Sequence, residues 1–291
     1  MQRTGGSRCS PQPLTASVRL PTTMQSGLNC HFVSRFLTRP WEYGQRQLSY
    51  FDFDQGDVRS CSSRSLFAVT GTNTNDVETR LNQVIETPIS SAMARLVDME
   101  AESEELLEWP LFRALSLLLM LQPLRSRSSE HHEHAERLEE TVTRSDAELD
   151  ELTKDAQAAY WLGRISVRSD APLLYPVSGF FPLVAKRRDG SYGSAIAIPA
   201  SKRHVFVAVP RSFDWGSSMA QWSANGAGFV ANVSVGTGSR VVIPPSAMVG
   251  LQREQVVALI HQMRAASKQM INLCQDFNTA LARLNTECGL S

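Results

Sequence analysis

The chain has little lysine, no closely spaced pair of cysteines and no apolar run long enough to cross a membrane. Only four of its 29 basic residues are lysines. The 29 acidic residues equal the basic ones in number, which gives a pI near 7.0. A neutral chain is not expected to bind nucleic acid or a membrane surface non-specifically as its main activity. The five cysteines lack C-x-x-C spacing, which argues against a disulfide framework or a zinc cage and favours reduced thiols in a cytoplasmic protein.

Export signals and known catalytic motifs are also missing. No stretch has the flanks of a signal peptide, and the glycines between 226 and 238 separate predicted strands instead of opening a helix, so no dinucleotide fingerprint is present. Residues 1–29 hold three arginines and no acid, without the amphipathic face of an organelle-targeting peptide. We expect a disordered tail there, or a true start at Met24.

The most apolar segment, residues 109–122, reads WPLFRALSLLLMLQ and is broken only by Arg113 and Ser116. Pro110 suits the first turn of a helix. A membrane span needs about 20 apolar residues, and this run is shorter. A helix that is apolar on all sides is usually buried on all sides, so we predict the central helix of a soluble core, ended by Pro123.

The N-terminal half carries further local signals. Alternating apolar residues on both sides of the turn at 54–57 predict a β-hairpin over residues 47–61, and residues 65–69 predict a short strand. Thr74 or Asn75 should cap a helix that Pro88 kinks or splits. The acidic run from Asp98 to Glu108 is typical of a solvated loop.

Two segments show a heptad seam, with apolar residues spaced alternately four and three apart. They cover residues 138–159, within a helix predicted over 128–163, and residues 256–284 of a long C-terminal helix. Either seam alone would expose an apolar stripe, which soluble monomers avoid. We therefore expect the two helices to pack together, within one chain or across a homodimer.

Between residues 164 and 243, branched apolar runs broken by glycine and proline predict a mainly antiparallel sheet of five or more strands. The expected fold class is α+β, with an N-terminal hairpin and helices, the central buried helix, this sheet and the long C-terminal amphipathic helix. The predicted organisation is a tail over 1–29, one domain over 30–248 and the terminal helix over 249–291. The predicted strands are 165–167, 173–175, 180–185, 195–198, 204–209, 229–235 and 240–243.

Five short motifs follow one another along residues 30–245. They are His31-Phe-Val-Ser34, Ser49–Asp54, the pair Val77-Glu78 and Ile85-Glu86, Gln122-Pro-Leu-Arg125, and Ser169-Asp170-Ala-Pro172. In this order they resemble a widespread, mostly bacterial family known as domain of unknown function forty-two thirty-eight. The resemblance implies a fold and site positions but does not identify a reaction, and the cofactor is unknown. One departure is that Ser34 stands where the family has proline.

The first functional interpretation is an enzyme, with hydrolysis as the expected class and an unidentified small-molecule or macromolecular substrate. His31 can act as a base near neutral pH, and Asp170 would orient it or share a metal ion with it. We expect the two to face one cleft. Arg125, with Arg35 and Gln122 in the neighbouring motif positions, is expected to bind substrate.

Each of these residues also has a structural interpretation. For His31 the structural interpretation is a histidine that bonds to backbone at the start of a strand anchored by Phe32 and Phe36, and for Asp170 it is a turn residue before Pro172. Glu78 and Glu86 are further candidates for an acid or a ligand.

The second functional interpretation is a non-catalytic interaction or sensor module assembled through the heptad helices. His131 and His134, three residues apart, could share a helix face, but a solvated first turn accounts for them better than a metal site.

Overall fold

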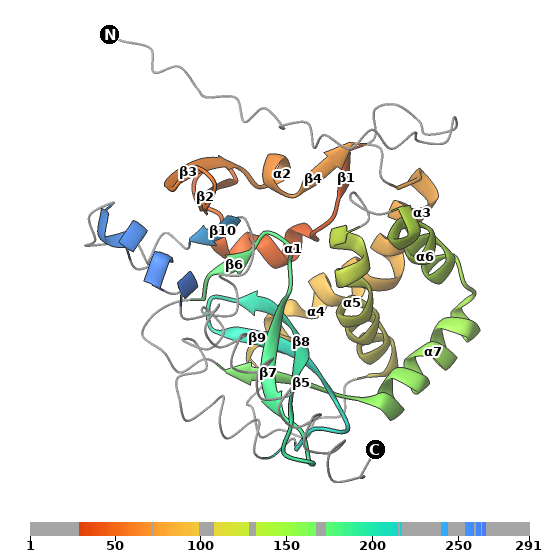
Figure 1. Cartoon of the computed structure of the whole chain (residues 1–291). Helices are drawn as coiled ribbons and strands as arrows, with labels where there is room; N and C mark the ends of the chain where they lie inside the picture. The colour runs from red at the N-terminus through yellow and green to blue at the C-terminus, as the bar shows by residue number, and fades with distance from the viewer. Residues whose placement is uncertain are drawn as a thin grey trace.

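A computed structural model describes residues 29–70, 73–98, 108–127, 132–166, 173–214, 216, 240–243 and most of 254–265. Helices and antiparallel sheets make up the fold, which confirms the α+β class (Figure 1). Two four-stranded sheets and a two-stranded ribbon lie beside a group of helices. No helix among these residues is long and apolar enough to cross a membrane.

The N-terminal part begins with β1 (Asn29–His31), which pairs antiparallel with β4 (Ala68–Thr70). Between them lie two short helices, α1 (Arg35–Thr38) and η1 (Arg39–Trp41), and then the predicted hairpin. The expected strand through Phe36 is wrong, because the chain leaves β1 after His31 and Ser34 starts α1.

The predicted hairpin is present as β2 (Gln47–Asp52) and β3 (Asp57–Ser62). The expected strand over 65–69 begins later than predicted, because residues 63–66 form α2 (Ser63–Leu66). The Ser62 hydroxyl accepts a hydrogen bond from the Ser65 N–H and so caps this short helix.

The next helix is interrupted, as Pro88 predicts. Thr74 caps α3 (Asn75–Leu81) by accepting a hydrogen bond from the Val77 N–H. A single π-helical stretch, η2 (Asn82–Glu86), then leads into α4 (Thr87–Asp98). Pro88 has no N–H for the carbonyl four residues earlier and its ring crowds that carbonyl, which explains why the preceding turn widens.

The predicted central helix is α5 (Trp109–Arg127), and most of its side chains are buried on every side. The predicted end at Pro123 is wrong, since the helix continues for one more turn. An internal proline costs a helix one backbone hydrogen bond. We attribute the continuation to tertiary contacts of the last turn, where Arg125 is 3% exposed and Leu124 packs on the core.

The single helix predicted over 128–163 is also wrong. Two helices, α6 (His132–Val142) and α7 (Asp146–Ala159), are separated at Ser145, and a strand already starts at Tyr160. The Ser145 hydroxyl accepts from the Glu148 N–H, and the Glu148 carboxylate accepts from the Ser145 N–H. This capping box starts a new helix inside what the heptad spacing presented as a continuous seam.

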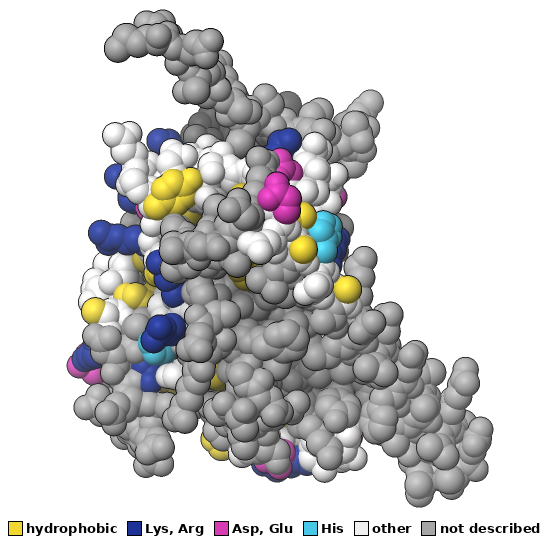
Figure 2. Space-filling model, turned by 90° about the vertical axis from the view of Figure 1, so that its left-hand side faces the viewer, with side chains coloured by type: hydrophobic (Ala, Val, Ile, Leu, Met, Phe, Trp, Pro, Cys, Tyr) yellow, Lys and Arg dark blue, Asp and Glu magenta, His cyan; other side chains and the backbone are white. Residues whose placement is uncertain are grey.

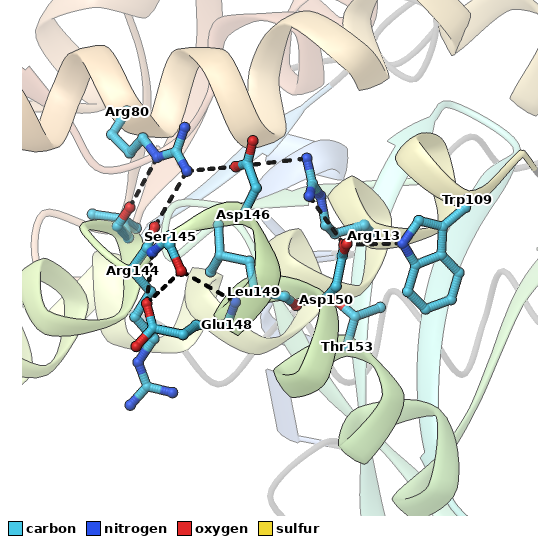
Figure 3. Close-up of polar contacts among 11 residues, drawn as sticks. Arg80, Trp109, Arg113, Arg144, Ser145, Asp146, Glu148, Leu149, Asp150 and Thr153 are labelled. Carbon is cyan, nitrogen blue, oxygen red and sulfur yellow. Dashed lines mark hydrogen bonds and ion pairs between the residues drawn. The ribbon is translucent and has the colours of Figure 1, made fainter.

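Two arginines from other helices hold the α6–α7 junction (Figure 3). Arg80 of α3 donates to the carbonyls of Val142 and Arg144 and lies 2.6 Å from an Asp146 oxygen. Arg113 of α5 pairs with Asp150 at 3.0 Å. These contacts fix α3 and α5 relative to the helix pair.

The remaining strands are divided between two sheets, so the expectation of one sheet of five or more strands is wrong for the described residues. One sheet has the order β5-β9-β8-β7, and the other has the order β3-β2-β10-β6. Since β2 is buried along nearly its whole length, its free edge needs a partner, which β10 supplies. The strands are β5 (Tyr160–Ser166), β6 (Tyr175–Pro176), β7 (Phe181–Lys186), β8 (Tyr192–Ser201), β9 (His204–Pro210) and β10 (Arg240–Ile243).

The described part of the second heptad segment packs on the hairpin. The His261 ring lies 5.3 Å from that of Phe51, and the Arg264 guanidinium lies 3.9 Å above the ring of Phe53. In Figure 1 the described part of this segment, drawn in blue, lies on the opposite side of the fold from α6 and α7, so this part does not pair with them as expected. Residues 266–291 and the predicted strand 229–235 lie outside the described residues, and pairing across a dimer stays a prediction.

Figure 2 shows the left-hand side of the view in Figure 1. On the described part of this face, Lys and Arg side chains are scattered among acidic, hydrophobic and uncharged ones. The charge of this face is therefore mixed in sign and not arranged as one continuous basic stripe.

The central position of α5 gives the first prediction. Leu118 is 2% exposed in the single core cluster that joins the helices to both sheets. Leu118→Ala should lower the free energy of unfolding by roughly 2–5 kcal/mol, because it removes buried methyl groups and leaves a cavity. Denaturant unfolding measures this loss, and Met120→Ala, at a half-buried position of the same helix, should cost less. An unchanged transition midpoint for Leu118→Ala would show that α5 is not central.

The break between α6 and α7 gives the second prediction. Ser145→Ala should destabilise the protein by about 0.5–2 kcal/mol, because it removes the side-chain acceptor of the capping box. Ser90→Ala, at an exposed position within α4, should be neutral or slightly stabilising because alanine favours helix. Equal stability of the Ser145 and Ser90 variants would contradict the role of the cap.

Candidate functional site

The side chains of highest chemical interest gather around the last turn of α5. Arg125 on that turn contacts residues from two other segments: Ser34 before α1, and Glu78 and Glu86 on the continuous helical stretch of α3 and η2. Both segments are far from Arg125 in the sequence, so tertiary packing brings the side chains together. We call Ser34, Glu78, Glu86 and Arg125 the arginine cluster.

Arg125 is almost completely buried and is held by charge-assisted hydrogen bonds. Its Nη1 donates to the Ser34 hydroxyl at 2.9 Å and to Glu86 Oε1 at 2.8 Å. Its Nη2 lies 3.6 Å from Glu78 Oε2. A buried guanidinium without such partners would be costly, and removing one member of a buried pair typically costs about 3–5 kcal/mol.

Ser34 stands where a serine usually caps a helix, but its hydroxyl serves the arginine cluster instead. The hydroxyl donates to Glu86 Oε1 at 2.9 Å, and no side-chain cap bond to α1 is present. The residue is fully buried, with φ −63° and ψ 132°. Proline adopts this φ, so the serine found in place of the family proline keeps a compatible backbone and adds a hydrogen-bonding group.

The two glutamates are positioned by different local devices. Glu86 is the last residue of the π-helical stretch that precedes Pro88, and such wide turns often occur at functional sites. Glu78 accepts a hydrogen bond from the Asn73 side chain. The Asn73 backbone in turn bonds to the Cys30 thiol, so Glu78 is tied to the strand that ends at His31.

His31 is half-buried beside the arginine cluster. Burial lowers its pKa below the ordinary value of 6.5, and the charges of Arg125 and Arg64 lower it further, whereas Glu78 and Glu86 raise it. The net effect favours the neutral imidazole at neutral pH. A neutral imidazole can accept a proton, which is the property required of a general base.

Gln122 lies one turn before Arg125 and holds two backbone segments together. Its Nε2 donates to the carbonyls of Phe32 at 2.8 Å and Ser178 at 3.0 Å. Gly179 has φ +77°, and a Cβ there would lie 2.6 Å from the same nitrogen. Only glycine fits this close approach. The amide group of Gln122, which is expected to bind substrate, therefore holds Phe32, the residue after His31, against α5.

The other predicted site residues are less closely associated with the arginine cluster. The Arg35 side chain is about half exposed and lies 3.9 Å from a Glu42 oxygen. Asp170 falls outside the described residues, so its expected position near His31 stays a prediction. His131 does too, and among the described residues no group of three His, Cys, Asp or Glu side chains could hold a metal ion.

Sequence reasoning missed the role of Ser34, which was noted only as the absence of a motif proline. The useful signal would have been a small hydroxyl residue three positions after His31, in a segment with many apolar neighbours. Glu78 and Glu86 were recognised as candidates, but nothing in the sequence indicated that both would meet Arg125.

The lowered pKa of His31 gives the third prediction. Since unfolding raises this pKa toward 6.5, the unfolded chain binds more protons and stability should fall as the pH drops through that region. Unfolding midpoints measured at several pH values between 8 and about 5 test this. Replacing the histidine, in His31→Asn, should weaken the acid-induced loss relative to the parent chain. An identical pH dependence in both proteins would contradict the burial of a neutral His31.

Comparison with curated proteins and with solved structures finds no match for the chain. A family model does match residues 29–173, which contain β1, the arginine cluster and α5. The family is described as "Protein of unknown function (DUF4238)". This match confirms the resemblance derived from the His31, Glu78 and Arg125 motifs, and the chain belongs, through these residues, to that uncharacterised family.

Proposed function

We propose that this protein is a hydrolase-like enzyme in which His31 is the general base. The observation that carries the proposal is a half-buried histidine whose pKa is lowered, next to a buried arginine held between two glutamates. Perturbed titratable groups that gather in this way occur preferentially at functional sites.

The chemistry that this arrangement supports is proton removal from water. Neutral His31 would take a proton as the water oxygen attacks an electrophilic carbon or phosphorus atom of the substrate. One O–H bond breaks, the proton passes to the imidazole, and the resulting imidazolium is stabilised by the carboxylates of Glu78 and Glu86. The proton then leaves His31 for the departing group of the substrate.

Asp170 remains the proposed partner of His31 on the strength of the family motif Ser169–Pro172. An aspartate bonded to the imidazole would fix its tautomer, and a shared metal ion is the alternative role. Either role requires proximity. A separation of more than about 10 Å between the two side chains would exclude both direct hydrogen bonding and shared ligation.

The three residues proposed to bind substrate are in different surroundings. Arg125 donates both Nη1 protons within the protein, so it would act on a substrate mainly through its charge. Gln122 likewise donates its amide protons to backbone carbonyls. Arg35 has the more exposed guanidinium and is the better candidate for direct contact with an anionic group.

The alternative, a non-catalytic interaction or sensor module, is supported less by the described residues. It depended on two long heptad helices, and the first of these is divided into α6 and α7 by the Ser145 cap. The described part of the second covers the hairpin instead of remaining open. We therefore keep the enzyme as the proposed function.

The test is a hydrolysis screen of the full chain against small ester, amide and phosphoester substrates. His31→Asn should lower kcat/KM by roughly 10²–10⁴-fold, the usual contribution of a positioned acid or base. The rate should fall at acidic pH as His31 becomes protonated. This fall should occur at a pH below 6.5, the ordinary pKa of histidine.

The matched control is His204→Asn, at the β8–β9 turn, where the histidine bonds to Ser201. This variant should retain the parental rate. Hydrolysis that survives His31→Asn, or a wild-type chain that cleaves none of the three bond types, contradicts the proposal.

A further inference from the structure

Two glutamates flank Arg125, but they are held unequally. Glu86 Oε1 accepts hydrogen bonds from both Arg125 Nη1 and the Ser34 hydroxyl, at 2.8 Å and 2.9 Å. Since Nη1 also donates to the hydroxyl, the three groups close a triangle of hydrogen bonds. Glu78 Oε2, by contrast, lies 3.6 Å from Arg125 Nη2, which is beyond hydrogen-bond distance.

Glu86 is held to Arg125 more firmly than Glu78 is. Displacing Glu86 from Arg125 would break two bonds to one carboxylate oxygen, and bonds to ionised groups are the stronger kind. The second oxygen of Glu78 is attracted by charge alone, while its first is anchored by Asn73. Exposure does not distinguish the two, because their side chains are 22% and 24% exposed. The Ser34 hydroxyl donates to the same Glu86 oxygen that bonds to Arg125, and so adds to the hold on this glutamate.

We infer that Ser34 is a positioning residue that commits Glu86 to Arg125 and leaves Glu78 as the carboxylate that stabilises protonated His31. The inference rests on the proposed function, in which His31 gains a proton from water. Ser34 contacts neither the imidazole nor a substrate in this scheme. It acts through the choice of which glutamate neutralises the arginine.

The charges around His31 agree with this assignment. The groups that face it are Arg125 from α5, Arg64 from α2, Glu78 from α3 and Glu86 from η2, and Glu78 raises the pKa of His31 more than Glu86 does. The direct attraction between two charges grows as they approach each other, so of the two glutamates Glu78 is the better placed to stabilise a protonated His31.

The experiment is an NMR titration of His31 in the full chain, following its imidazole Cε1–H signal, which is assigned by its loss in His31→Asn. Glu78→Gln should lower the pKa of His31 more than Glu86→Gln does. Combining each change with Ser34→Ala should reduce that difference by half or more, because the released Glu86 and Glu78 then share Arg125.

Two further variants make the result decisive. Ser116→Ala removes another fully buried hydroxyl from α5, one that bonds only to the Phe112 carbonyl, and should leave the difference unchanged. Ser34→Pro removes the cluster hydroxyl in a residue that suits the observed φ, and should act like Ser34→Ala if that variant folds poorly.

An effect of Glu86→Gln equal to or greater than that of Glu78→Gln would overturn the inference. A difference that persists in both Ser34 variants would do the same. The titration needs no substrate, so its outcome is independent of the hydrolysis screen. The assigned roles of Glu78 and Glu86 can thus prove wrong while hydrolysis is found. They can equally prove right when no hydrolysis is found.

Discussion

The structure depends on one buried positive charge. Arg125 lies in the last turn of the buried central helix α5, where a guanidinium is tolerated only if carboxylates and hydrogen-bond acceptors surround it. Its partners are Ser34, which lies before α1, and Glu78 and Glu86, which lie on the continuous helical stretch of α3 and η2. The need to pair Arg125 therefore fixes how the N-terminal ribbon and the α3–η2 region meet α5, and this arrangement brings His31 to the edge of the same cluster.

Backbone irregularities make these meetings possible. The π-helical stretch before Pro88 presents Glu86, and the extra turn of α5 after Pro123 presents Arg125. Gly179, with its positive φ, lets the chain approach the amide of Gln122 closely enough to hold the segment next to His31. Each irregularity costs some local stability, and each lies beside a residue of the site, as expected where function competes with regular structure.

Local signals in the sequence predicted much of the fold. The hairpin, the Thr74 cap, the buried central helix and the disturbance at Pro88 depend on neighbouring residues, and all are present. Predictions that required a choice between local and tertiary effects were less successful. Heptad spacing could not reveal that the capping box at Ser145 would divide the helix, and helix propensity could not reveal that α5 would continue past Pro123.

The sequence predicted which residues belong to the site better than it predicted which of them bond to one another. The motif residues His31, Glu78, Glu86 and Arg125 were recognised from the sequence, and the last three are in one cluster with His31 beside it. Their pairing depends on contacts across 39 to 91 positions, for which a single sequence contains no signal. The pairing of β2 with β10 could not be foreseen for the same reason, since Arg240 on β10 follows its neighbour Asp52 on β2 by 188 positions.

The central claim is that one arginine holds separate segments in place, and amide hydrogen exchange of Arg125→Met tests it most directly. The account predicts a joint loss of protection in β1, α3 and η2, because the uncompensated glutamates would separate from α5. Protection in the β5-β9-β8-β7 sheet and in α7 should be retained, because their contacts do not involve Arg125. Loss confined to the last turn of α5, or unchanged protection in all three segments, would contradict the account.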